Sequence, residues 1–226
     1  MNLSLPISDL AAYVTKQLDA NFPDGKPVGL KDNLAIVEHA VEKLNWCFRH
    51  STSSRYCQNG EGRFDHLMAD QHCQFILLLS QCVWKELGDE RLASKLFGLN
   101  RAMHGLNCMY DAALPDIFLL FHVTGTVLGK AEYSDFLVVL QNCTVGLHEG
   151  SYPVLGRGVV LAAGASVVGK CRVGDRVAIG SNTAIFKKDV PNDTVAYRNE
   201  SGTLVLQPTA APFAQRFFNV SIDSKP

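Results

Sequence analysis

Between Val154 and Pro191 an aliphatic residue returns at every sixth position, and this spacing constrains the fold more than any other feature. The aliphatic positions are Leu155, Leu161, Val167, Val173, Ile179 and Ile185. Neither a helical period of 3.6 nor a strand alternation of 2 gives a repeat of six. A coil with three short flat sides does, because each hexapeptide forms one side and turns one corner. Glycines fall between the aliphatic positions, where a corner with positive φ favours them. The spacing therefore predicts a parallel β-helix, the alternative being an ordinary β-rich domain with aligned glycines.

The composition is that of a globular chain without an obvious charged partner. Of 226 residues, 47% are hydrophobic and 19% charged, which permits a packed core and argues against disorder. The net charge of −1 disfavours binding to nucleic acid or to an anionic membrane surface. No apolar run is long enough to span a bilayer, and the first residues lack the pattern of a signal peptide.

The seven cysteines form no CxxC pair, so the spacing typical of a zinc site is absent and no metal is expected. An odd number of cysteines is most simply explained by reduced thiols. We therefore expect a cytoplasmic protein.

Residues 1–105 are predicted to form a helical N-terminal domain. Stripes of apolar residues and capping signals indicate helices from Ser8, over Leu34–Phe48, over Asp65–Leu87 and from Asp89 to about His104. The polar stretch from His50 to Gly62 has no period and is expected to be a loop.

Acidic and imidazole side chains gather at the start of the third predicted helix, as Asp65, His66, Asp70 and His72. Such a cluster can bind a metal or a polar substrate. It is also what helix capping and solvation produce, and both interpretations remain open.

The β-helix is predicted to occupy residues 106–206, followed by a C-terminal tail over 207–226. Upstream of the clean repeat, Leu114 and Leu120 keep the spacing, the polar Thr126 comes next, and the register is lost around 132–136. Residues 148–153 interrupt the coil as a loop, and Pro191 closes the clean repeat. A last strand is expected near 203–206.

His122 is the main candidate for a catalytic residue, since it lies beside small residues in the segment Phe121–Gly129. An imidazole with an ordinary pKa near 6.5 can remove a proton from a bound nucleophile. A lone histidine on a β-rich surface can equally be only a polar surface residue.

Several ordered landmarks resemble the serine acetyltransferases, which belong to the left-handed parallel β-helix acyltransferases. The family's Asp-His-Ala-Thr-Gly motif is matched by Phe121-His122-Val123-Thr124-Gly125, and its Leu-Gln-x-x-Thr-Leu-Gly-Gly by residues 140–147. Its tryptophan-containing helix is matched by residues 83–88, and its Pro-Lys-Ile by residues 153–155. The resemblance implies an α+β protein in which a helical domain precedes a left-handed parallel β-helix.

The chain departs from the family at charged positions. The aspartate that partners the histidine base, fifteen residues upstream, is Asn107, and the substrate-binding aspartate before the base is Phe121. The family's Arg-His pair is Ser151-Tyr152, and the loop before it is shorter. An acceptor less charged than free serine is therefore expected. On the shortened loop His148 and Glu149 are candidates for a replacement acid or base, or are ordinary solvated residues.

The resemblance implies acetyl-CoA as co-substrate, held along the edge of the coil between neighbouring subunits of a homotrimer or a dimer of trimers. The positions that match cofactor-binding positions are Gly146, Ala163, Gly164, Ser181, Lys187 and Lys188. Catalytic candidates are His122, Asn107, His148 and Tyr152, and acceptor-binding candidates are Phe121, Glu149, Ser151 and Asp65.

The leading hypothesis is acetyl transfer from acetyl-CoA to a hydroxyl or amine of a small molecule or sugar, with His122 as general base. The alternatives are serine O-acetylation and a catalytically silent homologue that acts as a binding or scaffold protein. A carbonic anhydrase on the same coil would need three converging histidines, and the spacing of His104, His122 and His148 does not match that pattern.

Overall fold

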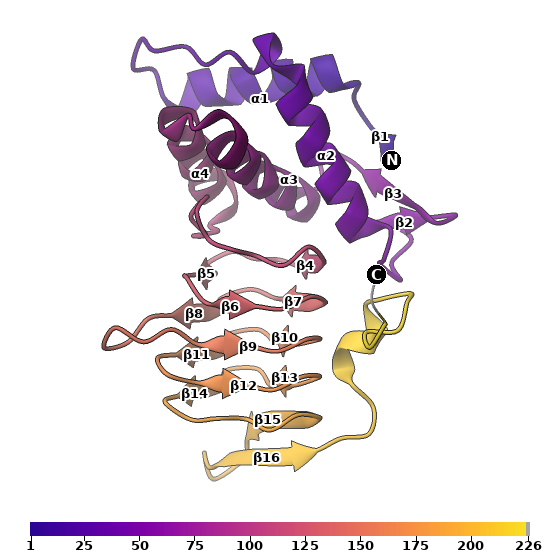
Figure 1. The fold of residues 1–226 in the computed structure, drawn as a ribbon, viewed down its shortest axis with the longest axis vertical. Coiled ribbons are helices and arrows are strands. Elements are labelled where there is room, and N and C mark those ends of the chain that lie inside the picture. Colours follow the sequence, from indigo (N-terminus) through magenta and orange to yellow (C-terminus); the bar gives the residue numbers. More distant parts are fainter. Residues whose placement is uncertain (225–226) are drawn as a thin grey trace.

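Helices and a small sheet make up the N-terminal part of the computed structural model, which describes residues 1–224 (Figure 1). The helices are α1 (Ile7–Asn21), α2 (Leu34–Phe48), α3 (Ala69–Cys82) and α4 (Glu90–His104), with short turns η1 (Leu30–Asp32) and η2 (Val83–Leu87). Strands β1 (Asn2–Leu3), β3 (Glu61–Phe64) and β2 (Cys57–Gln58) lie side by side in that order. No helix within residues 1–224 is both long and apolar enough to cross a membrane.

Two expectations for this part need correction. The stretch from His50 to Gly62 is not only a loop, because Cys57 and Gln58 pair with Gly62 and Glu61 in a hairpin. The third helix begins at Ala69 rather than Asp65, since the Asp65 carboxylate accepts a hydrogen bond from the Leu67 N–H in a turn before the helix. After Cys82 the helix continues only as a π-turn, which Gly88 ends at a φ of 63°.

The rest of the chain winds into a parallel β-helix with three faces (Figure 1). One face stacks β4 (Phe118–Leu120), β7 (Leu137–Val139), β10 (Val160–Leu161), β13 (Ala178–Ile179) and β15 (Thr194–Arg198). The second stacks β5 (Val127–Leu128), β8 (Thr144–Gly146), β11 (Ser166–Val168) and β14 (Ala184–Phe186). The third stacks β6 (Glu132–Tyr133), β9 (Val154–Leu155) and β12 (Arg172–Val173). The six repeated aliphatic residues are all buried inside the coil, as predicted.

The coil also continues through 121–136, where the repeat of six fails in the sequence. Leu128 pairs with Val145, and Tyr133 pairs with Leu155. The inward positions are therefore spaced by eight residues from Leu120 to Leu128 and by five from Leu128 to Tyr133. Thr126 does not take an inward strand position. It is buried at the corner, where its hydroxyl donates to the Leu140 carbonyl at 3.0 Å and accepts from the Cys143 N–H at 3.2 Å. The coil likewise runs past Pro191, because β15 pairs in parallel with β13.

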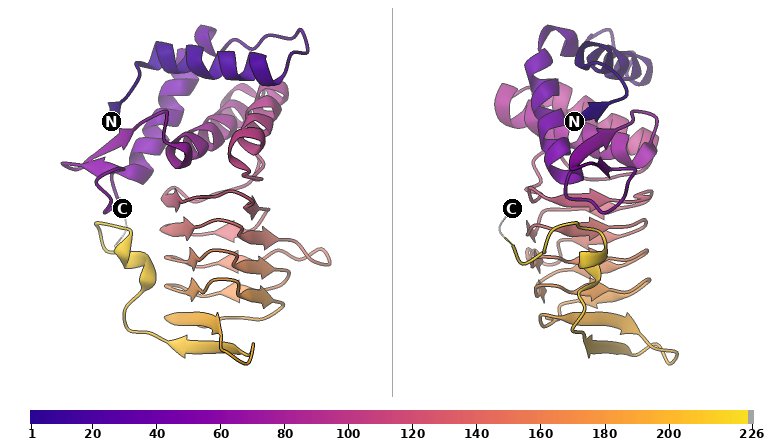
Figure 2. Two further views of the ribbon diagram at one scale, coloured as in Figure 1. Left: turned by 180° about the vertical axis from the view of Figure 1, so that it is seen from behind. Right: turned by 90° about the vertical axis from the view of Figure 1, so that its right-hand side faces the viewer.

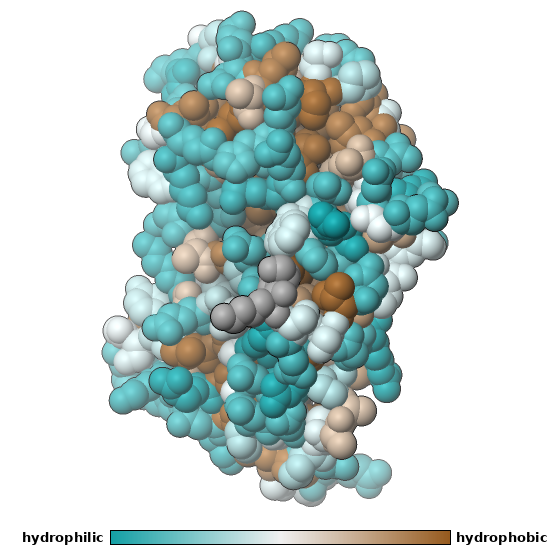
Figure 3. Space-filling view, turned by 45° about the vertical axis from the view of Figure 1, so that its right-hand side comes forward, coloured by the Kyte–Doolittle hydropathy of each residue, from teal (hydrophilic) through white to brown (hydrophobic). Residues whose placement is uncertain are grey.

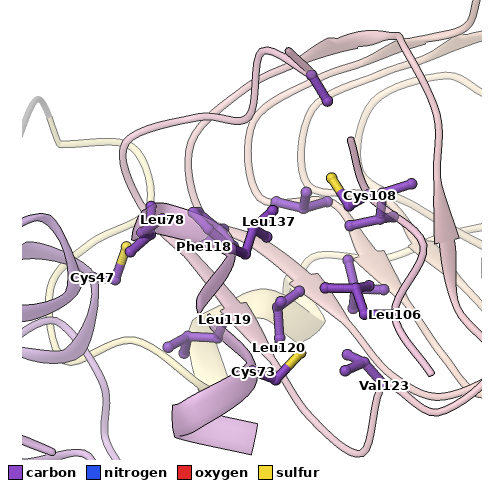
Figure 4. Close-up of a cluster of buried hydrophobic side chains, with 14 of the residues drawn as sticks. Cys47, Cys73, Leu78, Leu106, Cys108, Phe118, Leu119, Leu120, Val123 and Leu137 are labelled. Carbon is purple, nitrogen blue, oxygen red and sulfur yellow. The ribbon is translucent and has the colours of Figure 1, made fainter. Parts of the chain in front are cut away.

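The helices cover the first edge of the coil. In Figure 4, Cys47 of α2 and Cys73 and Leu78 of α3 surround β4 with apolar contacts. A buried amide side chain completes this junction, since Gln74 of α3 donates to the Phe118 carbonyl at 2.9 Å and accepts from the Leu120 N–H at 3.3 Å. Gln74 therefore supplies β4 with a hydrogen-bond donor and acceptor on the side where the later strands of this face have a neighbouring strand. On the face of the molecule that Figure 3 shows, exposed apolar side chains gather mainly on the helical part.

The segment after β16 (Leu204–Pro208), which pairs antiparallel with β15, is not a free tail. It contains η3 (Phe213–Arg216) and runs back along the coil to the helical part (Figure 2). There the Thr52 N–H donates to the Phe217 carbonyl at 2.9 Å, and the Asn219 N–H donates to the His50 carbonyl at 2.9 Å. Residues 225–226 of the predicted tail lie outside the described residues. We call residues 209–224 the C-terminal strap.

Replacing Gln74 with leucine is expected to destabilise the fold by about 2–4 kcal/mol, because a buried N–H and a buried carbonyl of β4 lose their partner. Urea unfolding measures the difference. Gln58→Leu, at an exposed position, is the control and should change the free energy of unfolding by less than about 0.5 kcal/mol. Equal effects of the two substitutions would contradict the assigned role of Gln74.

Phe218→Ala tests whether the C-terminal strap is part of the core. Phe218 is 1% exposed and its ring lies 4.9 Å from that of Phe136, so its loss is expected to cost about 3–5 kcal/mol in thermal or urea unfolding. Phe213→Ala, at a ring that is 38% exposed, should cost less than about 1 kcal/mol. A strap that is dispensable for stability would make both values small.

Candidate functional site

One edge of the coil brings together His122 and three of the predicted cofactor-binding residues. This edge joins the first face to the second, and backbone hydrogen bonds connect each of its corners to the corner of the coil before. The N–H groups of Asn142, Gly164 and Asn182 donate to the carbonyls of Thr124 at 3.0 Å, Gln141 at 2.9 Å and Ala163 at 2.9 Å, respectively. Gly164 has a φ of 73°, and a Cβ there would lie 2.2 Å from Asn182 Oδ1. Ala163, Gly164 and Ser181 thus form a narrow backbone track below His122. We call this the His122 edge.

His122 sits at the topmost corner of this edge with a φ of 53° and a side chain that is 77% exposed. Its position is fixed by Asp70, in the first turn of α3, whose Oδ1 accepts the His122 backbone N–H at 2.8 Å. Asp70 Oδ2 lies 3.5 Å from His122 Nδ1, and only 18% of the Asp70 side chain is exposed. The start of a helix also stabilises a carboxylate. An imidazole held at Nδ1 by a carboxylate presents Nε2 to solvent as a proton acceptor.

The expectation that Asn107 orients the imidazole is not met in this structure. Asn107 forms an isolated bridge with Val127 through its backbone, and among the described residues no hydrogen bond joins its side chain to His122. The carboxylate partner comes instead from the helical part. Asp70 is visible in the sequence as part of an acidic and imidazole cluster, but nothing in its spacing connects it with a residue 52 positions later.

Phe121, predicted to bind the acceptor, packs between the helical part and the C-terminal strap. Its ring centroid lies 5.4 Å from that of Tyr56 and 5.6 Å from that of Phe217. An aspartate at this position would be placed among aromatic rings. The phenylalanine therefore has a packing role, and it supplies no negative charge at the position just before His122.

A second edge gathers the other predicted residues. His148, Glu149, Ser151 and Lys187 line one cavity of about 300 Å³ together with Lys170. Lys187 forms an ion pair with Glu149, and the His148 ring lies 4.8 Å from that of Phe186. Backbone hydrogen bonds in both directions between His148 and Ser151 close the loop. We call this the Lys187 edge.

Lys170 was missed by the sequence analysis, although stacking of successive coils could have revealed it. A Cβ on its neighbour Gly169 would meet Lys187 Cγ at 3.5 Å. Of the remaining predicted residues, Gly146 ends β8 and accepts a hydrogen bond from the Gly169 N–H at 3.0 Å, whereas Tyr152 and Lys188 are exposed at nearby corners. All of them lie on the Lys187 side of the second face, across from His122.

Asp65 and the histidines near it do not join His122. Asp65 lines a different cavity with Arg55 and Arg63, and its carboxylate closes a turn before α3 rather than capping the helix, which begins after Met68 without a side-chain cap. Buried His72 lies with its Nδ1 2.9 Å from Nε2 of the partly buried His104. Burial, together with His104 and His66, lowers the pKa of His72 to about 3, so the His72 ring stays neutral at physiological pH. This pair belongs to the junction between α3 and α4.

Curated relatives of this chain are serine acetyltransferases. The Helicobacter pylori (strain 26695) enzyme is 30% identical over 118 residues, which are 50% of this chain and 68% of the relative. The Synechococcus elongatus enzyme is 32% identical over 100 residues, 42% of this chain and 41% of the relative. Serine acetyltransferase 3, mitochondrial, of Arabidopsis thaliana is 27% identical over 210 residues, 90% of this chain and 49% of the relative. No family model matches the chain.

The alignments thus span about half the length of several of these relatives.

Among solved structures, serine acetyltransferase from Vibrio cholerae superposes with a TM-score of 0.69 at 17% identity, covering 91% of this chain and 81% of that one. A serine acetyltransferase in complex with CoA gives a TM-score of 0.66 at 16% identity, covering 89% and 86%. These structures share the order of a helical part followed by a left-handed parallel β-helix. The chain belongs to the serine acetyltransferase family within the hexapeptide-repeat acyltransferases.

Proposed function

We propose that this protein is an acetyl-CoA-dependent acyltransferase that acetylates a hydroxyl or amine of a small molecule or sugar. The observation that carries the proposal is the pairing of His122 with Asp70, which restores a carboxylate to the imidazole although the family's usual position is Asn107. A catalytically silent homologue has no need of such a pair. The relative in complex with CoA supports the choice of acetyl donor.

The mechanism follows from the geometry of His122. Nε2 takes the proton of the acceptor hydroxyl or amine while the acceptor atom attacks the thioester carbonyl carbon. The carbon–sulfur bond then breaks, and the CoA thiolate takes up the proton. Asp70 stabilises the imidazolium that forms between these proton transfers and holds Nδ1 protonated. No covalent enzyme intermediate is required, because a thioester is already activated.

The surface of the coil has the features that an extended thioester substrate requires. Along the His122 edge, Ala163 and Gly164 let a pantetheine arm approach the backbone, since the corner has no bulky side chain. Lys170 and Lys187 supply positive charge at the other edge, where phosphates bind well. The His122 edge therefore holds the base and the pantetheine arm, and the Lys187 edge holds the phosphates.

The two edges are separated on one chain by the second face, whose three-residue strands span about 10 Å. A second copy packed against this face would place its Lys187 edge beside the His122 edge of the first. This arrangement supports a homotrimer with shared sites. Exposed apolar side chains at the Lys187 side, Leu147, Tyr152 and Phe186, fit a surface that another copy covers.

The acceptor is expected to carry fewer charges than free serine. Ser151 and Tyr152 stand where the family has Arg-His, and Phe121 is packed among aromatic rings. Amino sugars fit this site better than an amino acid does, because they carry no carboxylate and the arginine that binds the carboxylate in the family is replaced by Ser151. Serine O-acetylation remains the second candidate, since the relatives are serine acetyltransferases.

The test is thiol release from acetyl-CoA with serine, homoserine, amino sugars and nucleotide sugars as acceptors. His122→Ala is expected to lower kcat by about 10²–10⁴-fold, the usual contribution of a general base. Asp70→Asn should lower kcat by roughly 10–100-fold, leave KM nearly unchanged and alter the pH profile of kcat/KM, because it acts through the imidazole.

Asp65→Asn is the matched control, since it removes a carboxylate before the same helix without touching His122. Its kcat should equal that of the parent. Equal loss in the Asp65 and Asp70 variants, or full activity of His122→Ala, would overturn the mechanism. Release with serine alone would refute the argument about acceptor charge, and binding of CoA without release to any acceptor would favour the silent homologue.

A further inference from the structure

Three side chains of different chemical kinds meet at the far end of α3, away from His122. They are His39 on α2, Cys82 at the end of α3 and Glu86 in the turn η2. One ligand atom from each lies within 4.8 Å of the other two, and within residues 1–224 no other group of three such side chains meets this condition. The group borders a cavity of about 320 Å³.

Glu86 lies four residues after Cys82, so the two side chains share one face of the turn Val83–Leu87 and lie opposite His39. The turn is wound as a π-helix, and such turns are rare and occur often at functional sites. Gly88, at a φ of 63°, ends the turn and allows the chain to leave directly for α4.

The three groups form the nitrogen, sulfur and oxygen set that zinc takes from proteins. Cys82 is 1% exposed, whereas His39 and Glu86 have side chains that are 42% and 39% exposed. The inner ligand is therefore fixed and the outer two are free to adjust. A thiolate and a carboxylate together carry two negative charges, which a divalent cation neutralises.

Without a cation, the Cys82 thiol keeps its proton. Burial and the negative charge of Glu86 raise its pKa to about 12, and Lys43 and Lys85 only partly oppose this. A metal ion reverses the balance, since coordination to a thiol drives off the proton. Cation binding at this place must therefore release a proton, which gives it a measurable signature.

We propose that His39, Cys82 and Glu86 bind a zinc-class divalent cation whose fourth coordination position opens into the cavity. His39 Nδ1 and Glu86 Oε1 now lie 2.6 Å apart as an ion pair. Zinc bonds of about 2.0–2.1 Å in a tetrahedron separate two ligand atoms by roughly 3.3 Å, so these two exposed side chains move apart by about 0.7 Å. Both also approach Cys82 Sγ, from at most 4.8 Å to roughly 3.5 Å. The apolar residues Trp46, Leu78 and Leu114 wall the cavity and shield the sulfur.

The site is independent of acetyl transfer. Asp70, His122 and the two edges of the coil contribute nothing to it, and the cavity is walled by Leu114, Pro115 and Asp116 before β4. Its ligands come from α2 and from the end of α3 with the turn η2 rather than from a CxxC motif, so spacing in the sequence does not reveal it. Failure of this inference would leave the proposed acyltransferase untouched, and the reverse also holds.

Titration of the protein of 226 residues with Co²⁺ under reducing conditions tests the proposal, with Zn²⁺ as competitor. We expect one Co²⁺ per chain, an intense near-ultraviolet band from thiolate-to-cobalt charge transfer, and visible bands typical of four-coordinate cobalt. Proton release should accompany binding, and Zn²⁺ should abolish the spectrum. Elemental analysis after dialysis against Zn²⁺ should give a stoichiometry near one.

Cys82→Ser should remove the charge-transfer band, and His39→Ala and Glu86→Gln should each weaken binding at least tenfold. Glu42→Gln, which changes another residue lining the cavity, and Cys57→Ser, which removes a half-exposed thiol elsewhere, are the matched controls and should bind as the parent does. Circular dichroism confirms that each variant is folded. No cobalt spectrum in the parent, or a band lost in Cys57→Ser but kept in Cys82→Ser, would overturn the proposal.

Discussion

Every strand of a parallel β-helix finds its hydrogen-bond partners in the coils before and after it, so the first coil has one side without a partner. Here the side chain of Gln74 supplies the missing donor and acceptor to β4 from α3. Because a buried unpaired N–H or carbonyl costs about 1–3 kcal/mol, the coil depends on the helices for more than apolar cover. The register of α3 on the first coil is thereby fixed, and with it the place of every residue in the first turn of that helix.

The candidate site depends on the same junction. Asp70 lies one helical turn before Gln74 on α3, and it reaches the backbone and the imidazole of His122 from there. A shift of the helix along the coil would break both contacts together. In this chain the carboxylate beside His122 therefore comes from the helical part, whereas the position fifteen residues upstream in the coil is Asn107.

The sequence predicted best where corner lengths are constant. From Leu155 to Ile185 each side of the coil uses six residues, so spacing alone identified the inward positions. Between Leu120 and Tyr133 the inward positions are spaced by eight and then by five residues. A search for a period of six therefore fails there, although the strands of the coil continue. The helix over Leu34–Phe48 was predicted to the residue, because its apolar stripe is unbroken.

The site was predicted only in part, since contacts between distant segments leave no periodic signal. His122 stood out from its neighbours in the motif, but its partner Asp70 could not be told apart from Asp65 by spacing. The small residues of the His122 edge were found through resemblance, and Lys170 was overlooked although the coil repeat places it next to Lys187. The packing of the C-terminal tail against the helices was not predicted, because its aromatic residues have no period that indicates their burial.

The C-terminal strap changes how a solenoid of this kind comes apart. Repeat structures ordinarily fray from an end, since each coil contacts only its neighbours. In this chain the strap joins the last coil to the helical part, with hydrogen bonds between residues about 170 positions apart, such as Asn219 and Arg49. Opening the far end therefore also strains the contacts beside the helices, and the molecule is expected to unfold as one cooperative unit. Because closing a loop of such length costs conformational entropy before its contacts form, the strap is expected to slow folding.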